Sequence, residues 1–211
     1  PHMLIMELVK KFPFIAQLLR VPKPEKGTTK LPPVGIFRYN LVRIVRYVID
    51  CGFMFVNRNL VDSKLLSRCL SLMFAYPHHS VLLSTMDEMI TIIYTRSIHR
   101  TLCVKMIKKY HFHTKLMECV IKSRGDESAP ALPIAAYLIN IANTMSANAW
   151  ARKNLRKNSE WIDFLADIVF PTMVAQYVDE EQIPPRDSEK QQIEADKWKK
   201  RWEEFNFLIS V

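Results

Sequence analysis

The sequence predicts an all-α fold, and its composition gives two reasons. Only four glycines occur among 211 residues, although β-hairpins and phosphate-binding loops rely on glycine for tight turns. Hydrophobic residues make up 49% of the chain and recur mainly at spacings of three and four, as on a helix with one buried face. Because no G-x-G-x-x-G, Walker, G-x-S-x-G or H-E-x-x-H motif occurs, we expect a non-catalytic protein that works by binding.

The N-terminal part is expected to hold one helix and a linker. Residues 1–21 carry apolar residues at helical spacing and form the predicted N-terminal helix, which Pro13 should kink or break. Residues 1–3, Pro-His-Met, are typical of a cloning remnant. Residues 22–35 contain four prolines and predict a proline-rich linker. The remaining residues, 36–211, predict a helical-repeat domain.

Successive apolar stripes, separated by capping or breaking residues, divide the first part of this domain. Several stripes begin at a serine that can cap a helix, and Pro77 should end one helix because its ring excludes the helical conformation. The predicted helices, in chain order, are 36–57 with a bend at Gly52, 63–76, 80–93, 97–110 and one around 116–120.

The second part continues the pattern, with predicted helices at 132–145, 149–158, 159–183 and 188–207. The first of these is apolar nearly all round, so we expect Leu138, Ile141 and Ala142 to be buried at the centre. Pro171 should kink the third. The last carries an aromatic stripe, Trp198, Trp202 and Phe205, and fits a capping helix, or alternatively a docking helix for a partner.

Short loops between these helices favour antiparallel hairpins that stack in chain order. The pairs recur at roughly 35–50 residues, which is the range of helical repeats. The predicted architecture is therefore an armadillo/HEAT-like α-solenoid of stacked helical hairpins.

Cysteine and histidine positions give no sign of a metal site or a cofactor. The cysteines lie among apolar residues without a C-x-x-C pair, so we interpret all four as reduced core thiols of a cytoplasmic protein: Cys51, Cys69, Cys103 and Cys119. His111-x-His113 straddles a predicted helix junction and has no carboxylate or cysteine at ligand spacing beside it. No apolar run is long enough to predict a membrane span.

The net charge of +9 is unevenly distributed along the chain. Residues 1–125 hold 20 Lys and Arg against 7 Asp and Glu, whereas residues 126–211 hold 10 against 14. The first part should therefore attract acidic partners, although a basic face that is merely solvated would show the same counts.

Two asparagines in the most apolar helix are candidate partner-binding residues. Asn140 and Asn143 lie in the string Leu138–Asn143, and a buried amide there needs a hydrogen-bonding partner. The string resembles the third helix of an armadillo repeat, and the resemblance implies that Asn140 binds the backbone of an extended peptide. The alternative is that these amides bond a neighbouring turn within the core.

Arginines and tyrosines alternate on the helix that begins at Ile36. Side chains three and four residues apart share a helical face, and arginine beside tyrosine can hold carboxylates, phosphates or bases. A solvated helix face is the alternative. The candidate partner-binding residues here are Arg38, Tyr39, Arg43, Arg46 and Tyr47.

His78 and His79 follow Pro77 in a predicted turn between two helices. Polar side chains in such a turn can contact a partner, so both are candidate binding residues. The local requirements of the turn would explain them equally well.

Four short segments, in order, resemble the SAPS family, the regulatory subunits of Sit-four/PP-six type serine/threonine phosphatases. They are Pro33–Arg38, Met73–Leu82 with its Met-Phe-Ala-Tyr string, Tyr137–Asn143 and Arg201–Phe205 with its Arg-Trp-Glu-Glu-Phe string. Ala136-Tyr137 departs from the Gly-His that the family tends to have. The resemblance implies a helical-repeat scaffold that binds a phosphatase catalytic subunit and directs it to targets.

We therefore expect a non-catalytic, cytoplasmic scaffold with a protein partner, either a phosphatase catalytic subunit or an extended peptide. Two alternatives stay open. The basic residues 1–125 would suit a nucleic-acid-binding protein, whose affinity should fall steeply with salt. An adaptor at a membrane surface would need exposed apolar residues beside lysines.

Overall fold

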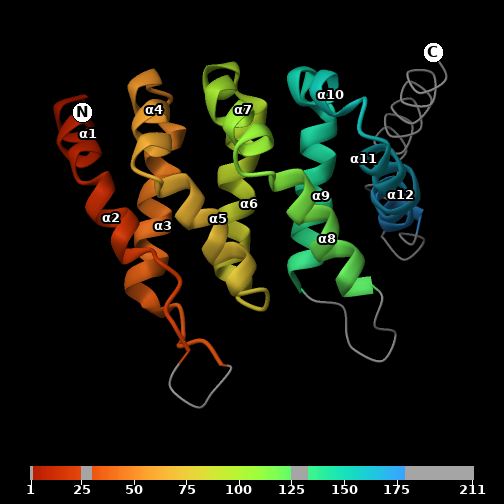
Figure 1. The fold of residues 1–211 in the computed structure, drawn as a ribbon, viewed down its shortest axis with the longest axis horizontal. Helices are drawn as coiled ribbons and strands as arrows, with labels where there is room; N and C mark the ends of the chain where they lie inside the picture. The colour runs from red at the N-terminus through yellow and green to blue at the C-terminus, as the bar shows by residue number, and fades with distance from the viewer. Residues whose placement is uncertain (1, 25–29, 125–132, 179–211) are drawn as a thin grey trace, which may run out of the picture. The chain divides into compact units, whose positions relative to one another are not determined.

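The computed structural model describes residues 2–24, 30–124 and 133–178. Helices are the regular secondary structure among these residues, which contain no strand. Contacts divide the chain into two units, residues 1–151 and 152–211. The sequence-based divisions were placed instead at residues 21 and 35. Figure 1 shows the helices in chain order.

The first unit contains α1 to α9 and the start of α10. Their bounds are α1 His2–Lys10, α2 Phe12–Leu18, α3 Gly35–Asp50, α4 Met54–Asp62, α5 Leu65–Ala75, α6 Ser80–Thr95, α7 Arg100–Lys108, α8 Phe112–Arg124, α9 Pro133–Ala147 and α10 Ala149–Leu155. A 3₁₀ turn, Ser97–His99, precedes α7.

Glycine and proline set several of these bounds. Gly52 adopts φ 72°, a left-handed conformation that ends α3, so the single bent helix predicted over 36–57 is wrong. Pro13 lies in the first turn of α2, and the break it was expected to cause falls just before it, between α1 and α2. Pro77 follows α5, as predicted.

The long helices α3, α6 and α9 lie next to one another in that order, because α6 packs against both of the others. α5 packs on α6 and α2, while α8 packs on α9 and α7 (Figure 1). The order of a short helix, a second helix and a long helix thus occurs twice, as α4–α5–α6 and α7–α8–α9. Lys64 and His111, directly before α5 and α8, are both left-handed, with φ 63° and 49°.

The core of this unit is formed by one face of each helix. Leu138, Ile141 and Ala142 are fully buried, which confirms their predicted burial. A buried polar pair lies between α4 and the 3₁₀ turn: the Asn57 amide nitrogen donates to the Ile98 carbonyl at 2.8 Å, and His99 Nδ1 lies 2.9 Å from Asn57 Oδ1.

The N-terminal helices and the linker are attached to this core. α2 packs against α5, and the Arg38 guanidinium on α3 donates to the Leu18 carbonyl at the end of α2. The Tyr76 hydroxyl donates to the Pro32 carbonyl at 2.7 Å, which fixes the end of the proline-rich segment.

The described part of the second unit contains the end of α10, then α11 Ser159–Phe164, a π-helical turn Leu165–Val169 and α12 Phe170–Val178. Asn158 caps α11 by accepting from the Trp161 backbone N–H at 3.0 Å. The π-turn directly precedes Pro171, where an ordinary helix would place the proline ring against a carbonyl one turn back. The predicted final helix over 188–207, with its aromatic stripe, lies outside the described residues.

Candidate functional site

The exposed sides of α3, α6 and α9 form one polar surface, which we call the α3–α6–α9 surface. Its residues are Tyr39, Arg43, Arg46, Tyr47 and Asp50 on α3, Asp87, Glu88, Thr91 and Thr95 on α6, Arg96 directly after α6, and Asn140 and Thr144 on α9. Opposite faces of these helices are buried in the core, so the amphipathic pattern of each helix places these side chains outward.

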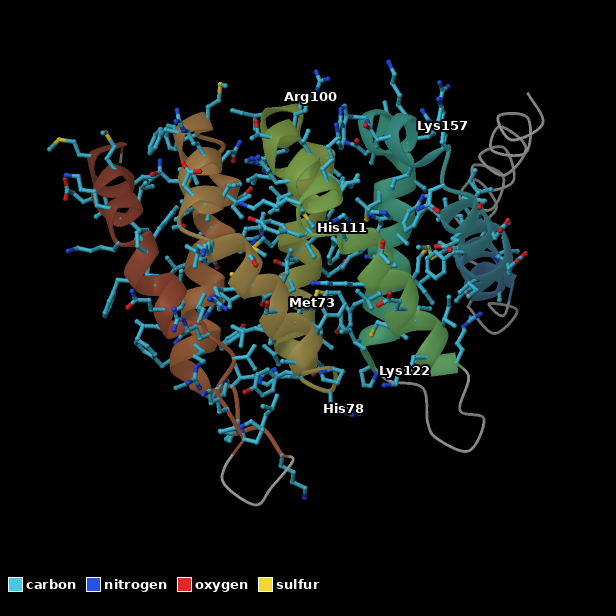
Figure 2. All side chains as sticks on the ribbon, viewed as in Figure 1. Met73, His78, Arg100, His111, Lys122 and Lys157 are labelled. Carbon is cyan, nitrogen blue, oxygen red and sulfur yellow. The ribbon has the colours of Figure 1, made fainter. Side chains whose placement is uncertain are left out.

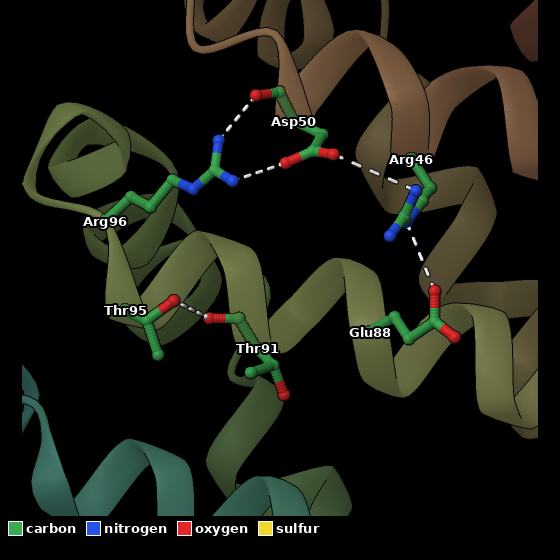
Figure 3. Close-up of polar contacts among 6 residues, drawn as sticks. All are labelled: Arg46, Asp50, Glu88, Thr91, Thr95 and Arg96. Atoms are coloured by element: carbon green, nitrogen blue, oxygen red, sulfur yellow. Dashed lines mark hydrogen bonds and ion pairs between the residues drawn. The ribbon is translucent and has the colours of Figure 1, made fainter.

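Two arginines and two carboxylates join α3 to α6 (Figure 3). Arg46 Nε lies 3.2 Å from the Glu88 carboxylate and its Nη1 lies 3.8 Å from Asp50. Arg96 pairs with the Asp50 carboxylate and also donates to the Asp50 carbonyl. The Arg46–Glu88 contact is an ion pair without well-aligned hydrogen-bond geometry. The four charges cancel, so this network leaves little net charge for a partner.

The positive charge of Arg43 is available to a partner. Arg43 is exposed, its guanidinium lies 5.7 Å from the centre of the Tyr39 ring, and no carboxylate contacts it in the described part of the chain. The neighbouring Tyr47 is 51% exposed, and Arg46 lies 4.9 Å from its ring centre. α3 therefore presents one uncompensated cation beside two aromatic rings.

Asn140 and Asp87 form a contact between α9 and α6. The Asn140 amide nitrogen lies 2.9 and 3.1 Å from the two Asp87 carboxylate oxygens, and Asn140 itself is exposed. Partial burial raises the pKa of Asp87, while the hydrogen bond from Asn140 lowers it and Glu88 raises it further. No cation contacts Asp87 among the described residues, so this end of the surface carries an uncompensated carboxylate.

The two histidines have different roles. His79 caps α6, because its Nδ1 accepts from the Leu82 backbone N–H at 3.1 Å, and its ring stacks near Tyr39 with 6.5 Å between centroids. His78 is exposed at the turn between α5 and α6, where Figure 2 labels it. The local requirement of the turn thus accounts for His79, and His78 is accessible from solvent.

Two predicted candidates lie away from the surface. Arg38 is half-buried and donates to the carbonyls of Leu18 and Val34, so its guanidinium holds α2 to α3. Asn143 is 8% exposed, and its Oδ1 accepts no hydrogen bond among the described residues. Ile44, on the same helix as Arg38, is 38% exposed, although its neighbour Val45 is fully buried.

The acidic half of the surface was not predicted from the sequence. Asp50, Asp87 and Glu88 pair with, or lie beside, the predicted arginines and Asn140. A signal was present, because Asp87 and Glu88 are the charged residues of a helix that is otherwise uncharged.

The cysteines divide by burial. Cys69 and Cys103 are buried thiols, and burial raises the pKa of each to about 12. Cys119 is half-buried, and Cys51 is exposed, so the prediction that all four lie in the core is wrong for Cys51.

The residues described here contain no group of three or more His, Cys, Asp or Glu side chains placed to hold a metal ion. Within them, every helix is too short or too polar to cross a membrane. The chain matches no protein-family model, and comparisons with curated proteins and with solved structures found no significant match.

Proposed function

We propose that this chain is a non-catalytic, protein-binding scaffold whose α3–α6–α9 surface binds an extended peptide segment. The observation that carries the proposal is the position of Asn140. It lies exposed on the third long helix, its side-chain nitrogen is held by Asp87, and its side-chain oxygen Oδ1 has no partner among the described residues. A peptide N–H that passes over α9 would satisfy that oxygen.

The architecture that we propose is an armadillo-like α-solenoid. Support comes from the repeated short–second–long helix order and from the two left-handed residues, Lys64 and His111, at corresponding positions 47 residues apart. In such an arrangement the long helices α3, α6 and α9 would line a continuous surface, which an extended chain can follow.

The charges of the surface favour a peptide of mixed charge. Arg43 is the uncompensated cation on α3, and Asp87 is the uncompensated carboxylate between α6 and α9. The neutral network around Arg46 separates them. A segment with an acidic residue over α3 and a basic residue over α9 would pair with both.

Selection of a displayed random-peptide library on the whole chain tests the proposal. Enriched peptides should lose affinity for Asn140→Ala, Tyr47→Ala and Arg43→Glu, and should keep it for Arg100→Glu. Arg100 is an exposed cation on α7 and so gives a matched charge reversal away from the surface (Figure 2). Equal affinity for all four variants would show that the peptide binds outside the α3–α6–α9 surface. A failure to enrich any peptide would contradict the proposal.

A phosphatase catalytic subunit is the specific protein partner that we propose from the SAPS resemblance. Purified catalytic subunit, flowed over immobilised chain, should bind saturably and should bind the Asn140→Ala and Arg43→Glu variants less tightly than the parent. Absence of binding would remove this partner while leaving peptide binding as a separate question.

A second candidate function is an adaptor role at a membrane surface. The observation that favours it is on α1, where Leu4 is 75% and Met6 46% exposed close in the sequence to Lys10 and Lys11. Such a pattern suits the interface of an anionic bilayer. Flotation with anionic vesicles, compared with a Leu4→Ser, Met6→Ser variant, distinguishes this role from peptide binding.

A further inference from the structure

A cavity of about 630 Å³ opens between the N-terminal helices and the turn that joins α4 to α5. α1 and α2 supply one wall, with Phe12, Pro13 and Ala16, and the α4–α5 turn supplies the other. Its volume falls in the range of about 300–1,000 Å³ that is typical of small-molecule sites. It lies away from the α3–α6–α9 surface, because its lining residues come from other helices.

Three cations line this cavity without a carboxylate partner in the described part of the chain. They are Arg20, after the end of α2, Lys64, directly before α5, and Arg68, in the first turn of α5. Two further charged residues line the cavity, and both are paired: Asp62 lies 3.6 Å from Arg58, and Lys10 pairs with Glu7. Folding therefore brings together three like charges that an anionic ligand would compensate.

A smaller basic cavity occurs at the corresponding place in the next helix triplet. It measures about 210 Å³ and is lined by His111, Lys115 and Lys109, together with α5 residues. His111 corresponds to Lys64 by its left-handed backbone directly before the second helix, and Lys115 corresponds to Arg68 four residues later. Figure 2 labels His111, which lies in the turn between α7 and α8. The basic cavity thus recurs, and the first copy is larger and contains two arginines, whereas the basic residues of the second are lysines and a histidine.

We propose that the larger cavity binds a polyphosphorylated small molecule through Arg20, Lys64 and Arg68. Arginine forks match phosphate oxygens in pairs, and each phosphate supplies close to two negative charges, so two phosphates within one small ligand are enough to neutralise the cluster. A carboxylate ligand would need several separate groups to do the same. The phosphates can come from a soluble compound or from the headgroup of a lipid, because the recognised chemistry is the same.

Calorimetric titration of the whole chain with inositol hexakisphosphate tests the site. The cavity variant combines Arg20→Gln, Lys64→Asn and Arg68→Gln, with asparagine chosen because it tolerates the left-handed backbone at 64. The control variant removes the same charge from three exposed cations that do not line this cavity, with Arg100→Gln, Lys108→Gln and Lys122→Gln.

We expect saturable binding by the parent chain, a rise in Kd of at least about tenfold in the cavity variant, and a change below about threefold in the control. Equal losses in both variants would mean that binding follows net charge alone, and would overturn the proposal. Absence of saturable binding by the parent would also overturn it. Circular dichroism verifies folding, and Arg68→Gln alone replaces the triple variant if that variant unfolds.

A site-specific measurement accompanies the titration. Lys64 should be protected from acetylation when inositol hexakisphosphate is present, as measured by mass spectrometry, while Lys108 should react at an unchanged rate. Equal protection of the two lysines, or of neither, would contradict a site at this cavity.

Vesicles distinguish the two sources of phosphate. Binding to phosphatidylcholine vesicles that contain phosphatidylinositol bisphosphate, with displacement by inositol hexakisphosphate, would support a lipid headgroup as ligand. Binding of the soluble compound without vesicle binding would support a free polyphosphate. Binding of a single-stranded RNA oligonucleotide that depends on these residues, together with no response to inositol hexakisphosphate, would overturn the proposal in favour of nucleic acid.

Discussion

Replacement of Asn57 by alanine should strongly destabilise the first unit. Asn57 is 2% exposed and His99 is fully buried, and the Asn57 amide connects α4 to the turn before α7 through two contacts of 2.8 and 2.9 Å. Since the Asn57 nitrogen donates to the Ile98 carbonyl, its oxygen must accept from His99 Nδ1–H. Asn57→Ala leaves that buried donor without a partner.

The expected loss follows from these contacts. An unsatisfied buried polar group costs about 1–3 kcal/mol, and the lost packing and second hydrogen bond bring the total to about 2–4 kcal/mol. For a unit of this size the melting temperature should fall by about 5–15 °C. The matched control is Asn59→Ala, because Asn59 lies on the same helix and donates to the Phe55 carbonyl at 2.8 Å but is only half-buried.

The buried Asn57–His99 pair also predicts how the stability of the first unit depends on pH. Burial lowers the pKa of His99, and Arg96 lowers it further. As pH falls, His99 therefore takes up a proton in the unfolded state before it does so in the folded state, where the ring stays neutral. Stability is therefore fully present above the ordinary pKa of 6.5 and is lost as pH falls below it. His99→Gln should flatten this dependence, whereas Asn57→Asp should stabilise the protonated ring and reduce the loss at low pH.

Thermal and urea unfolding, followed by circular dichroism at pH 8 and pH 5.5, measure both effects, since these two values lie on either side of the ordinary histidine pKa of about 6.5. If Asn57→Ala destabilises no more than Asn59→Ala, the buried pair is not the stabilising unit. If His99→Gln retains the full pH dependence of the parent, the titrating group lies elsewhere, and His113, whose pKa burial also lowers, is the next residue to replace.

Further predictions concern the surface, the core and the thiols. Asn140→Ala should lower the free energy of unfolding by less than about 1 kcal/mol, because its bond to Asp87 is exposed, while peptide affinity falls; a large loss of stability with unchanged affinity would make Asn140 structural. Leu138→Ala should lower the free energy of unfolding by about 2–5 kcal/mol, measured by urea unfolding, and a loss below 1 kcal/mol would contradict its central position. A thiol reagent should label Cys51 rapidly and leave Cys69 unlabelled under native conditions, as mass spectrometry would show; rapid labelling of Cys69 would mean that α5 opens readily.

Helical periodicity predicted the elements well where one face is apolar and a terminator is present. The helix before Pro77 ends there as proline chemistry predicts, which is a local effect. The next helix begins at Ser80 as predicted, although the His79 side chain caps it instead of the serine. The turns at Lys64 and His111 could not be predicted, because a left-handed lysine or histidine is set by tertiary packing and leaves no sequence signal comparable to glycine. The repeated helix triplet was not recognised in the sequence for the same reason, because the turns that mark its corresponding positions leave no sequence signal.

The pair Asn140 and Asn143 shows how far spacing alone can locate a site. Residues three apart on a helix differ by about 60° around its axis, which is enough to place one on the exposed side and the other at the buried edge. Asn140 is accordingly exposed and Asn143 is 8% exposed. The neighbour that decides their roles, Asp87, lies 53 residues away in the chain and is brought there by the packing of α6 on α9.

The arginines of α3 show that neighbouring helices also decide whether a charge is compensated. Arg43 and Arg46 are three apart and looked equivalent in the sequence, yet α6 places Glu88 opposite Arg46 and no carboxylate opposite Arg43. Pairing across helices, rather than composition, therefore decides which cations are available to a partner. The excess of basic residues in 1–125 does not make the α3–α6–α9 surface basic, because its charges largely cancel there. Uncompensated positive charge gathers instead around the cavity at Arg20, Lys64 and Arg68, and an anionic ligand should be sought at that cavity.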